Sequence, residues 1–145
     1  MATDIYKDAT LYAVWTVNAP TAATISITDT VRDKASVSLG YTGAELTNYT
    51  VYYRANSTGS YSSKSLGTSS TGTITGLQPN TSYQFYVTAT NPGGSKDSST
   101  TTATTKAYLP NANTPTASGT TDSESTIGVS ATGDTNAGIT NYTLY

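Results

Sequence analysis

The sequence predicts an all-β protein whose main part is a sandwich of two antiparallel sheets. Three observations favour this fold class: the composition, a series of short extended runs, and a repeat at the spacing of one sandwich domain. Hydrophobic residues make up 35% of the 145-residue chain and charged residues only 11%, while tyrosine occurs 12 times. Threonine and tyrosine suit a half-buried pleated surface, whereas a disordered chain would carry more charge and fewer aromatic residues. The composition therefore favours strands over disorder.

Short extended runs between residues 20 and 107 account for the strands of this sandwich. Turn residues separate each run from the next at intervals typical of seven-stranded sandwiches. The predicted strands span residues 23–28, 35–41, 48–55, 63–66, 72–75, 82–90 and 100–105. The glycine pair within residues 91–97 predicts a loop between the last two strands.

The interior of the sandwich follows from the alternation of side chains along each strand. The side chains expected to point inward are Ile25, Ile27, Val37, Leu39, Tyr49, Val51, Tyr53, Ile74, Leu77, Tyr83, Phe85, Val87 and Ala89. At about 1.5–3 kcal/mol for each large apolar side chain, this core offsets the cost of ordering the domain only modestly. We therefore expect ordinary stability.

A second, incomplete copy of the pattern follows the first. Residues 46–52 (Leu-Thr-Asn-Tyr-Thr-Val-Tyr) recur as residues 139–145 (Ile-Thr-Asn-Tyr-Thr-Leu-Tyr), an offset of roughly 90 residues. The predicted units are residues 1–19, a sandwich domain at 20–107, a linker at 108–114 and a partial second sandwich at 115–145. Because the copy stops within its third strand, we expect a fragment of a longer tandem repeat. The alternative is that a neighbouring chain supplies the missing strands.

Charge and the missing residue types exclude several classes of function. The net charge is −2 and the seven lysine and arginine residues are scattered, whereas binding nucleic acid requires clustered positive charge. No apolar run approaches the length of a membrane span, so we expect no membrane insertion. Cysteine and histidine are absent, which removes thiolate chemistry and the commonest general base and metal ligand. We therefore expect neither an enzyme nor a cofactor or metal site.

Residues 77–83 (Leu-Gln-Pro-Asn-Thr-Ser-Tyr) lead directly into an alternating strand. This Leu-x-Pro-x-Thr-x-Tyr pattern resembles the tyrosine corner of fibronectin type III domains, in which a tyrosine bonds back to main chain a few residues upstream. The resemblance covers about residues 20–107, and residues 115–145 more weakly. It implies a fibronectin type III or immunoglobulin-like β-sandwich.

Four residues would form this corner, and their implied role is structural: Leu77, Pro79, Thr81 and Tyr83. The sequence departs from the family at one core position. The family usually carries a tryptophan in a Val-x-Trp pattern on its second strand, but Leu39 stands there in the first copy and Ala131 in the second. The extra tyrosines are expected to fill the space that these smaller side chains leave.

A second resemblance concerns the N-terminal residues. Residues 10–17 (Thr-Leu-Tyr-Ala-Val-Trp-Thr-Val) are predicted to form a single strand. Residues 8–15 (Asp-Ala-Thr-Leu-Tyr-Ala-Val-Trp) are similar to the closing strand of the Listeria–Bacteroides repeats of bacterial surface proteins. The resemblance implies that residues 1–19 end a preceding surface-repeat domain.

A candidate binding face lies on the outer side of the predicted sheet. Tyr52 and Tyr86 would both point outward on neighbouring strands, close to Arg54. Such tyrosines can form an aromatic platform for a protein or glycan ligand, but outward aromatic pairs more often support the sheet itself. Both interpretations remain open from the sequence.

These observations together predict a non-catalytic spacer and adhesion module. By analogy with its resemblances, it would belong to an extracellular or cell-surface bacterial protein, as a fragment without its signal peptide. One alternative is a carbohydrate-binding accessory module of a secreted hydrolase. Another is a structural subunit of a phage virion or extracellular filament, in which a neighbour would complete the C-terminal strands by β-strand addition.

Overall fold

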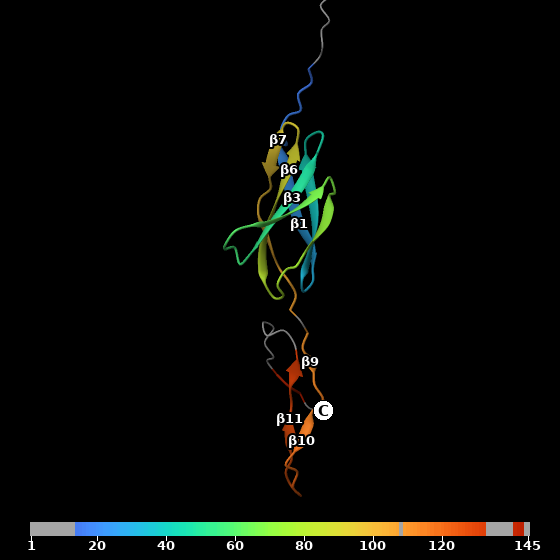
Figure 1. Ribbon diagram of the computed structural model, residues 1–145, viewed down its shortest axis with the longest axis vertical. Coiled ribbons are helices and arrows are strands. Elements are labelled where there is room, and N and C mark those ends of the chain that lie inside the picture. Colours follow the sequence, from blue (N-terminus) through green and yellow to red (C-terminus); the bar gives the residue numbers. More distant parts are fainter. Residues whose placement is uncertain (1–13, 108, 133–140, 144–145) are drawn as a thin grey trace, which may run out of the picture.

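The computed structural model describes residues 14–107, 109–132 and 141–143, and this described part consists of strands, turns and loops without a helix. Accordingly, these residues include no helix that is long and apolar enough to cross a membrane. The predicted fold class is confirmed, because two antiparallel sheets pack face to face as a sandwich (Figure 1).

Three strands form the smaller sheet, in the order β1-β2-β5. β1 (Ala22–Thr30) pairs antiparallel with β2 (Lys34–Thr42), which pairs antiparallel with β5 (Thr71–Thr75). The register of β1 shifts between Ile27 and Asp29. A bulge of this kind generally increases the local twist and bends the strand that carries it.

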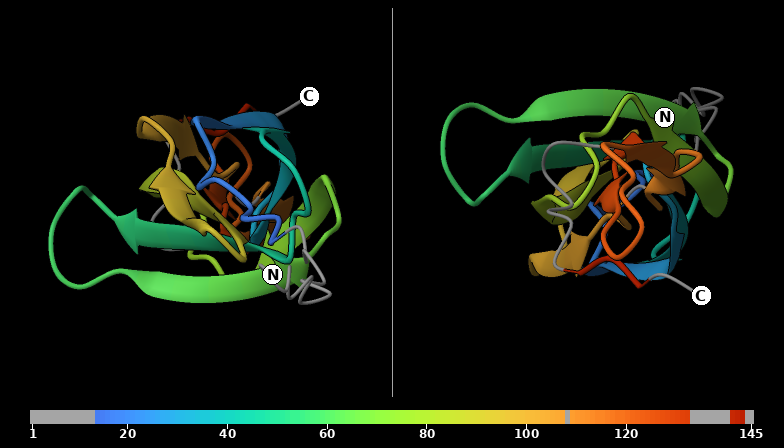
Figure 2. Two further views of the ribbon diagram at one scale, coloured as in Figure 1. Left: turned by 90° about the horizontal axis from the view of Figure 1, so that it is seen from above. Right: turned by 90° about the horizontal axis from the view of Figure 1, so that it is seen from below.

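The larger sheet has the order β4-β3-β6-β7, and β8 also pairs with β6. Its strands are β3 (Asn48–Ala55), β4 (Ser62–Gly67), β6 (Ser82–Asn91), β7 (Gly94–Asp97) and β8 (Thr101–Thr104). β6 is ten residues long, and along the edge opposite β3 it pairs first with β8 and then with β7. Figure 2 shows both sheets from their ends, with the β3–β4 loop standing out to one side.

The core between the sheets agrees with the alternation in the sequence. The buried apolar residues are Ala23, Ala35, Val37, Leu39, Tyr49, Val51, Ile74, Leu77, Tyr83, Phe85, Val87 and Ala89. Ile25, Ile27 and Tyr53, which were also expected inside, are partly buried against this cluster. Ala23 and Ala35 are buried without having been predicted to be, because an alanine gives a weak signal in an alternating pattern.

Leu39 occupies the core position where the resemblance led us to expect a tryptophan. It is buried, and the buried Tyr49 and the partly buried Tyr41 and Tyr53 belong to the same cluster. Burial, followed by the proximity of Tyr41, raises the pKa of Tyr49 above its usual value. Tyrosine rings thus supply much of the aromatic volume in this core.

The strand predicted at 100–105 is confirmed by β8, whereas the loop predicted at residues 91–97 is wrong in part. Residues 94–97 form β7, which turns back along β6 immediately after Pro92 and Gly93, and β8 then covers Thr101–Thr104. Asn91 pairs with Gly94, so the connection is a tight hairpin instead of a loop. β7 is too short and too polar to show a clear alternation of apolar and polar side chains.

The predicted N-terminal strand is wrong for the part that the structure describes. Residues 14–17 have no strand conformation, and Val14 and Trp15 are 84% and 91% exposed. These residues have the composition of a strand but lack a strand partner among the described residues. Residues 10–13 lie outside the described residues, and the assignment of 1–19 to a preceding domain stays a prediction.

Residues 109–132 form two small antiparallel pairs. β9 (Asn111–Ala112) pairs with β12 (Ala131–Thr132), and β10 (Thr116–Ser118) pairs with β11 (Thr126–Gly128). Nearly all their side chains are exposed. The partial second sandwich stays a prediction, and of the recurring segment 139–145 only residues 141–143 are described.

Candidate functional site

The outer side of the larger sheet carries the two tyrosines that the sequence indicated as a binding face. Tyr52 on β3 and Tyr86 on β6 lie directly opposite each other in the antiparallel register. Their rings are stacked, with centroids 4.7 Å apart and an angle of 7° between the ring planes. Since stacked rings cover each other's faces, the pair stabilises the two strands and leaves less aromatic surface for a ligand than two separate rings would.

Two further residues, which the sequence pattern does not indicate, complete this surface. Tyr61 lies edge-on against Tyr86, with ring centroids 4.9 Å apart, and its hydroxyl donates to Gln84 Oε1 at 2.7 Å. Gln84 lies opposite Arg54 in the register of β3 and β6. We refer to Tyr52, Arg54, Tyr61, Gln84 and Tyr86 as the tyrosine face. Gln84 could have been found only from the register, because it pairs with a residue 30 positions away.

Arg54 is held within the tyrosine face. Its Nε and Nη2 donate to Gln84 Oε1 at 3.0 and 2.8 Å, and its Nη1 donates to Gly59 O at 3.3 Å. The guanidinium carbon also lies 4.4 Å from the centroid of the Tyr61 ring, a favourable cation–π distance. With its donors engaged in this way, Arg54 anchors the β3–β4 loop to the sheet, and the geometry favours that role over binding an anion.

The pKa of Tyr86, in the tyrosine face, is raised above its ordinary value. Burial is the main cause that raises its pKa, and the negative charge of Asp97 and the neighbouring Tyr52 and Tyr61 add to it. The Asp97 carboxylate accepts a hydrogen bond from Thr88 Oγ1 at 2.6 Å on the same side of the sheet. The phenol of Tyr86 therefore stays protonated, and uncharged, at neutral pH.

Small polar side chains border the tyrosine face. The hydroxyls of Thr90 on β6 and Ser95 on β7 lie 3.0 Å apart, next to the pair of Thr88 and Asp97. Within the described part of the chain, no three acidic side chains gather in a way that could hold a metal ion. Hydroxyl groups beside aromatic rings suit a neutral polar ligand, such as a sugar, or the polar surface of a protein.

The predicted corner residues surround the start of β6. Tyr83 is buried, and its hydroxyl accepts a hydrogen bond from Gln78 N at 2.8 Å. Thr81 Oγ1 donates to Pro79 O at 2.7 Å, and the buried Leu77 follows β5. The side chain of Tyr83 thus fixes the segment that crosses from one sheet to the other.

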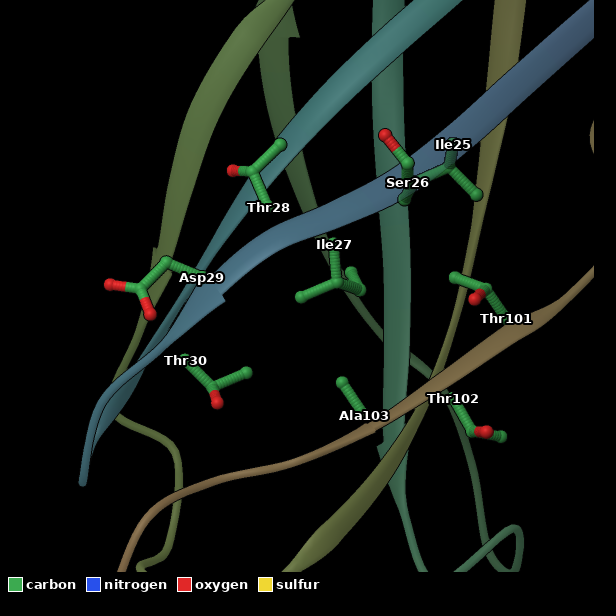
Figure 3. A pocket seen from close by; sticks show the side chains of 9 residues that line it. All are labelled: Ile25, Ser26, Ile27, Thr28, Asp29, Thr30, Thr101, Thr102 and Ala103. Atoms are coloured by element: carbon green, nitrogen blue, oxygen red, sulfur yellow. The ribbon is translucent and has the colours of Figure 1, made fainter.

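An open groove of about 500 Å³ lies between β1 and β8, at one side of the sandwich. Figure 3 shows Ile27 and Ala103 facing each other across it, with threonine and serine side chains around them. The one charged residue of its lining is Asp29, which lies 3.7 Å from Lys106 Nζ. Two of its hydroxyl groups, those of Ser26 and Thr28, donate hydrogen bonds to the main-chain oxygens of Ser38 and Ser36 on β2.

Comparisons with known proteins agree with this geometry. The family model described as "Fibronectin type III domain" matches residues 18–105. No curated protein matches the chain in sequence.

The solved structures that share the fold include the following two. The structure of chicken CNTN1 FN1-FN3 domains is 22% identical with a TM-score of 0.50, and the match covers 63% of this chain and 33% of that one. A second, called "Myokine structure", is 17% identical with a TM-score of 0.52, covering 63% of this chain and 99% of that one. The chain thus spans a third of the length of the solved CNTN1 FN1-FN3 chain, and at these identities the likeness shows the fold alone.

Proposed function

The chain belongs to the fibronectin type III family, and from that premise we propose that it is a non-catalytic spacer and adhesion module of a bacterial cell-surface or secreted protein. Domains of this family are generally non-catalytic and typically serve as modular spacers or binding units. The residues of the tyrosine face supply no nucleophile with an adjacent base, which is consistent with this proposal. The bacterial surface context is supported by the resemblance of residues 8–15 to the closing strand of a surface repeat.

The observation that carries the spacer proposal is the placement of the chain ends of the sandwich. The incoming residues 14–21 reach the sandwich at one end of its long axis, and residues 105–107 leave it at the other (Figure 1). β9, β10 and β11 lie beyond that second end. A module arranged in this way adds its full length to a chain of domains, as a spacer requires.

The proposal is tested in the parent protein on its native cells. Antibodies against residues 14–107 should label intact cells, and deletion of residues 18–107 should shorten the distance between the cell wall and the outermost domain. Replacement of the same residues by an unrelated sandwich of equal length should restore that distance. Absence of labelling on intact cells, or a replacement that fails to restore the distance, contradicts the spacer role.

The tyrosine face favours a second candidate function, the binding of a carbohydrate by an accessory module of a secreted hydrolase. Three tyrosine rings and several hydroxyl groups lie on one side of the larger sheet. Titration calorimetry with soluble polysaccharides should then show binding that Tyr52→Ala and Tyr61→Ala abolish. Tyr142→Ala, which changes an exposed tyrosine outside this face, is the matched control. Affinity weaker than about millimolar for the wild type eliminates this function.

A further inference from the structure

A buried amide holds the incoming chain at the first end of the sandwich. Asn91, the last residue of β6, is only 4% exposed. Its Nδ2 donates to Asn18 O at 2.8 Å and to Ala44 O at 2.9 Å, while its Oδ1 accepts from Gly93 N at 2.9 Å. One side chain therefore ties the incoming segment, the β2–β3 loop and the β6–β7 turn together.

The incoming segment also lies in close contact with the β6–β7 turn. A Cβ atom placed on Gly93 would lie 2.1 Å from Val17 O and 2.7 Å from Ala19 N. Any other residue at position 93 would thus displace the segment or the turn. Residues 17–19 are consequently seated on the sandwich before β1 begins at Ala22.

A buried hydroxyl holds the outgoing chain at the opposite end. Thr105 is 3% exposed, and its Oγ1 donates to Gln78 O at 2.6 Å and accepts from Thr81 N at 3.0 Å. Its main-chain N donates to Thr81 O at 3.0 Å. Because Gln78 N also donates to the hydroxyl of Tyr83, the tyrosine corner and the outgoing chain form one hydrogen-bonded unit.

Both anchoring points lie at the ends of the same strand. Asn91 ends β6, and Thr81 directly precedes its first residue, Ser82. β6 has ten residues, so it spans about 30 Å between the two points. It also lies between β3 on one side and β7 and β8 on the other, so neighbouring strands support it along its length.

We propose that β6 is the strand that carries tension through this module, and that Asn91 is the positioning residue that connects the incoming chain to it. Tension along the chain passes from Asn18 to Asn91, along β6, and out through Thr81 to Thr105. Without the bonds of Asn91, the same tension would act on the N-terminal end of β1, and would pull it away from β2. The biological use of this path rests on the proposed spacer function, but the path is a property of the sandwich itself.

The test holds the 145-residue chain by its two ends at constant force and measures the lifetime of the folded sandwich. Asn91→Ala should shorten this lifetime by about tenfold, the factor expected when a few hydrogen bonds that resist unfolding are lost. Gly93→Ala should also shorten it, since its methyl group displaces residues 17–19 while the side chain of Asn91 remains. This second variant gives the same readout if Asn91→Ala does not fold.

A second pulling geometry separates resistance to tension from ordinary stability. Ser60 lies in the exposed β3–β4 loop, and the chain has no cysteine, so Ser60→Cys provides a single attachment point. Pulling between residue 60 and the C-terminus does not load Asn18. Val37→Ala, a change in the core on β2, is the control that lowers stability away from the proposed path, and should act similarly in both geometries.

The outcomes distinguish the two proposals. A several-fold larger effect of Asn91→Ala or Gly93→Ala in the end-to-end geometry than in the residue-60 geometry supports the load path. Equal effects in both geometries overturn the load path and leave the spacer function standing. If the wild-type sandwich unfolds as soon as its ends are pulled, the spacer function fails together with the load path.

Discussion

The sandwich and residues 109–132 have similar sequences but very different packing. Both are rich in threonine and serine and contain alternating apolar residues. In the sandwich Val51 and Val87 are fully buried, whereas Ile127 and Val129 of the second region are 40% and 43% exposed. The difference shows that alternation predicts where strands form, but only a second sheet turns one face of those strands into a core.

The number of paired strands explains this difference. The β10–β11 pair has only three residues in each strand, and isolated two-stranded pairs are marginal in water. In the sandwich, by contrast, β6 pairs with three other strands and its inner face packs into the common core. The stability of the described chain should therefore come almost entirely from the sandwich.

The largest expected effect follows from removing the largest fully buried side chain. Phe85 is 1% exposed, so Phe85→Ala should lower the free energy of unfolding by about 3–5 kcal/mol. The matched change in the other region, Ile127→Ala, should alter it by less than about 0.5 kcal/mol. Urea denaturation followed by tyrosine fluorescence measures both. Similar losses for the two variants would show that residues 109–132 contribute to a common core.

The next effect concerns the hydrogen bond of the tyrosine corner. Tyr83→Phe removes the hydroxyl that accepts from Gln78 N and should cost about 1–3 kcal/mol, because a part-buried donor loses its partner. Tyr142→Phe, on an exposed tyrosine outside the sandwich, serves as the control and should leave the denaturation midpoint unchanged. A Tyr83→Phe variant as stable as the wild type would mean that the corner does not stabilise the crossover.

A smaller effect is a loss of stability at alkaline pH that arises within the sandwich. Burial raises the pKa of both Tyr49 and Tyr86 above the ordinary value of 10.0, so the folded chain keeps protons that the unfolded chain releases. The contribution of these two tyrosines to stability should be constant below about pH 10 and fall as the pH rises further through the raised pKa values. Urea midpoints measured between about pH 8 and 11 should show a smaller alkaline loss in Tyr49→Phe. If Tyr49→Phe loses as much stability at alkaline pH as the wild type, the loss arises from other groups.

The smallest effect is expected from the ion pair beside the outgoing chain. Lys106 Nζ and Asp29 Oδ1 lie 3.7 Å apart, and their side chains are 66% and 61% exposed. Solvent and salt screen such a pair, so Lys106→Ala should change the free energy of unfolding by at most about 0.5 kcal/mol. A larger loss, measured at low ionic strength, would place the boundary of the stable unit beyond Thr105.

The sequence predicted the sheet and core of the sandwich because each depends on local alternation. The strand at residues 48–55 and the inward side chains Val51 and Phe85 follow from the pattern alone. β7 was missed because four polar residues after a tight turn carry no alternation. Residues 14–17, the described part of the strand predicted at 10–17, show the opposite failure, since strand-forming residues need a partner that the pattern does not reveal.

The candidate site was less predictable than the fold. The outward positions of Tyr52 and Tyr86 follow from alternation, but the contacts of Arg54 depend on how β3 and β6 are aligned. Tyr61 lies in a loop and bonds to Gln84 from there. The conformation of a loop cannot be predicted from the alternation of apolar and polar residues. In the same way, nothing in the sequence distinguishes Asn91 from an ordinary turn residue. Its hydrogen bonds to Asn18 and Ala44 are visible only in the structure.

The contact between Gly93 and the incoming segment has a practical consequence for anyone who trims this module for expression. A piece that starts at residue 20, where the strand pattern begins, would lack the carbonyl of Asn18 and expose the surface on which residues 17–19 rest. Water would then have to replace the carbonyl oxygen of Asn18 as a hydrogen-bond acceptor for the side-chain amide of Asn91. A piece that starts at or before residue 16 keeps the contact between residues 17–19 and the sandwich. We expect that piece to be the more soluble and more stable of the two.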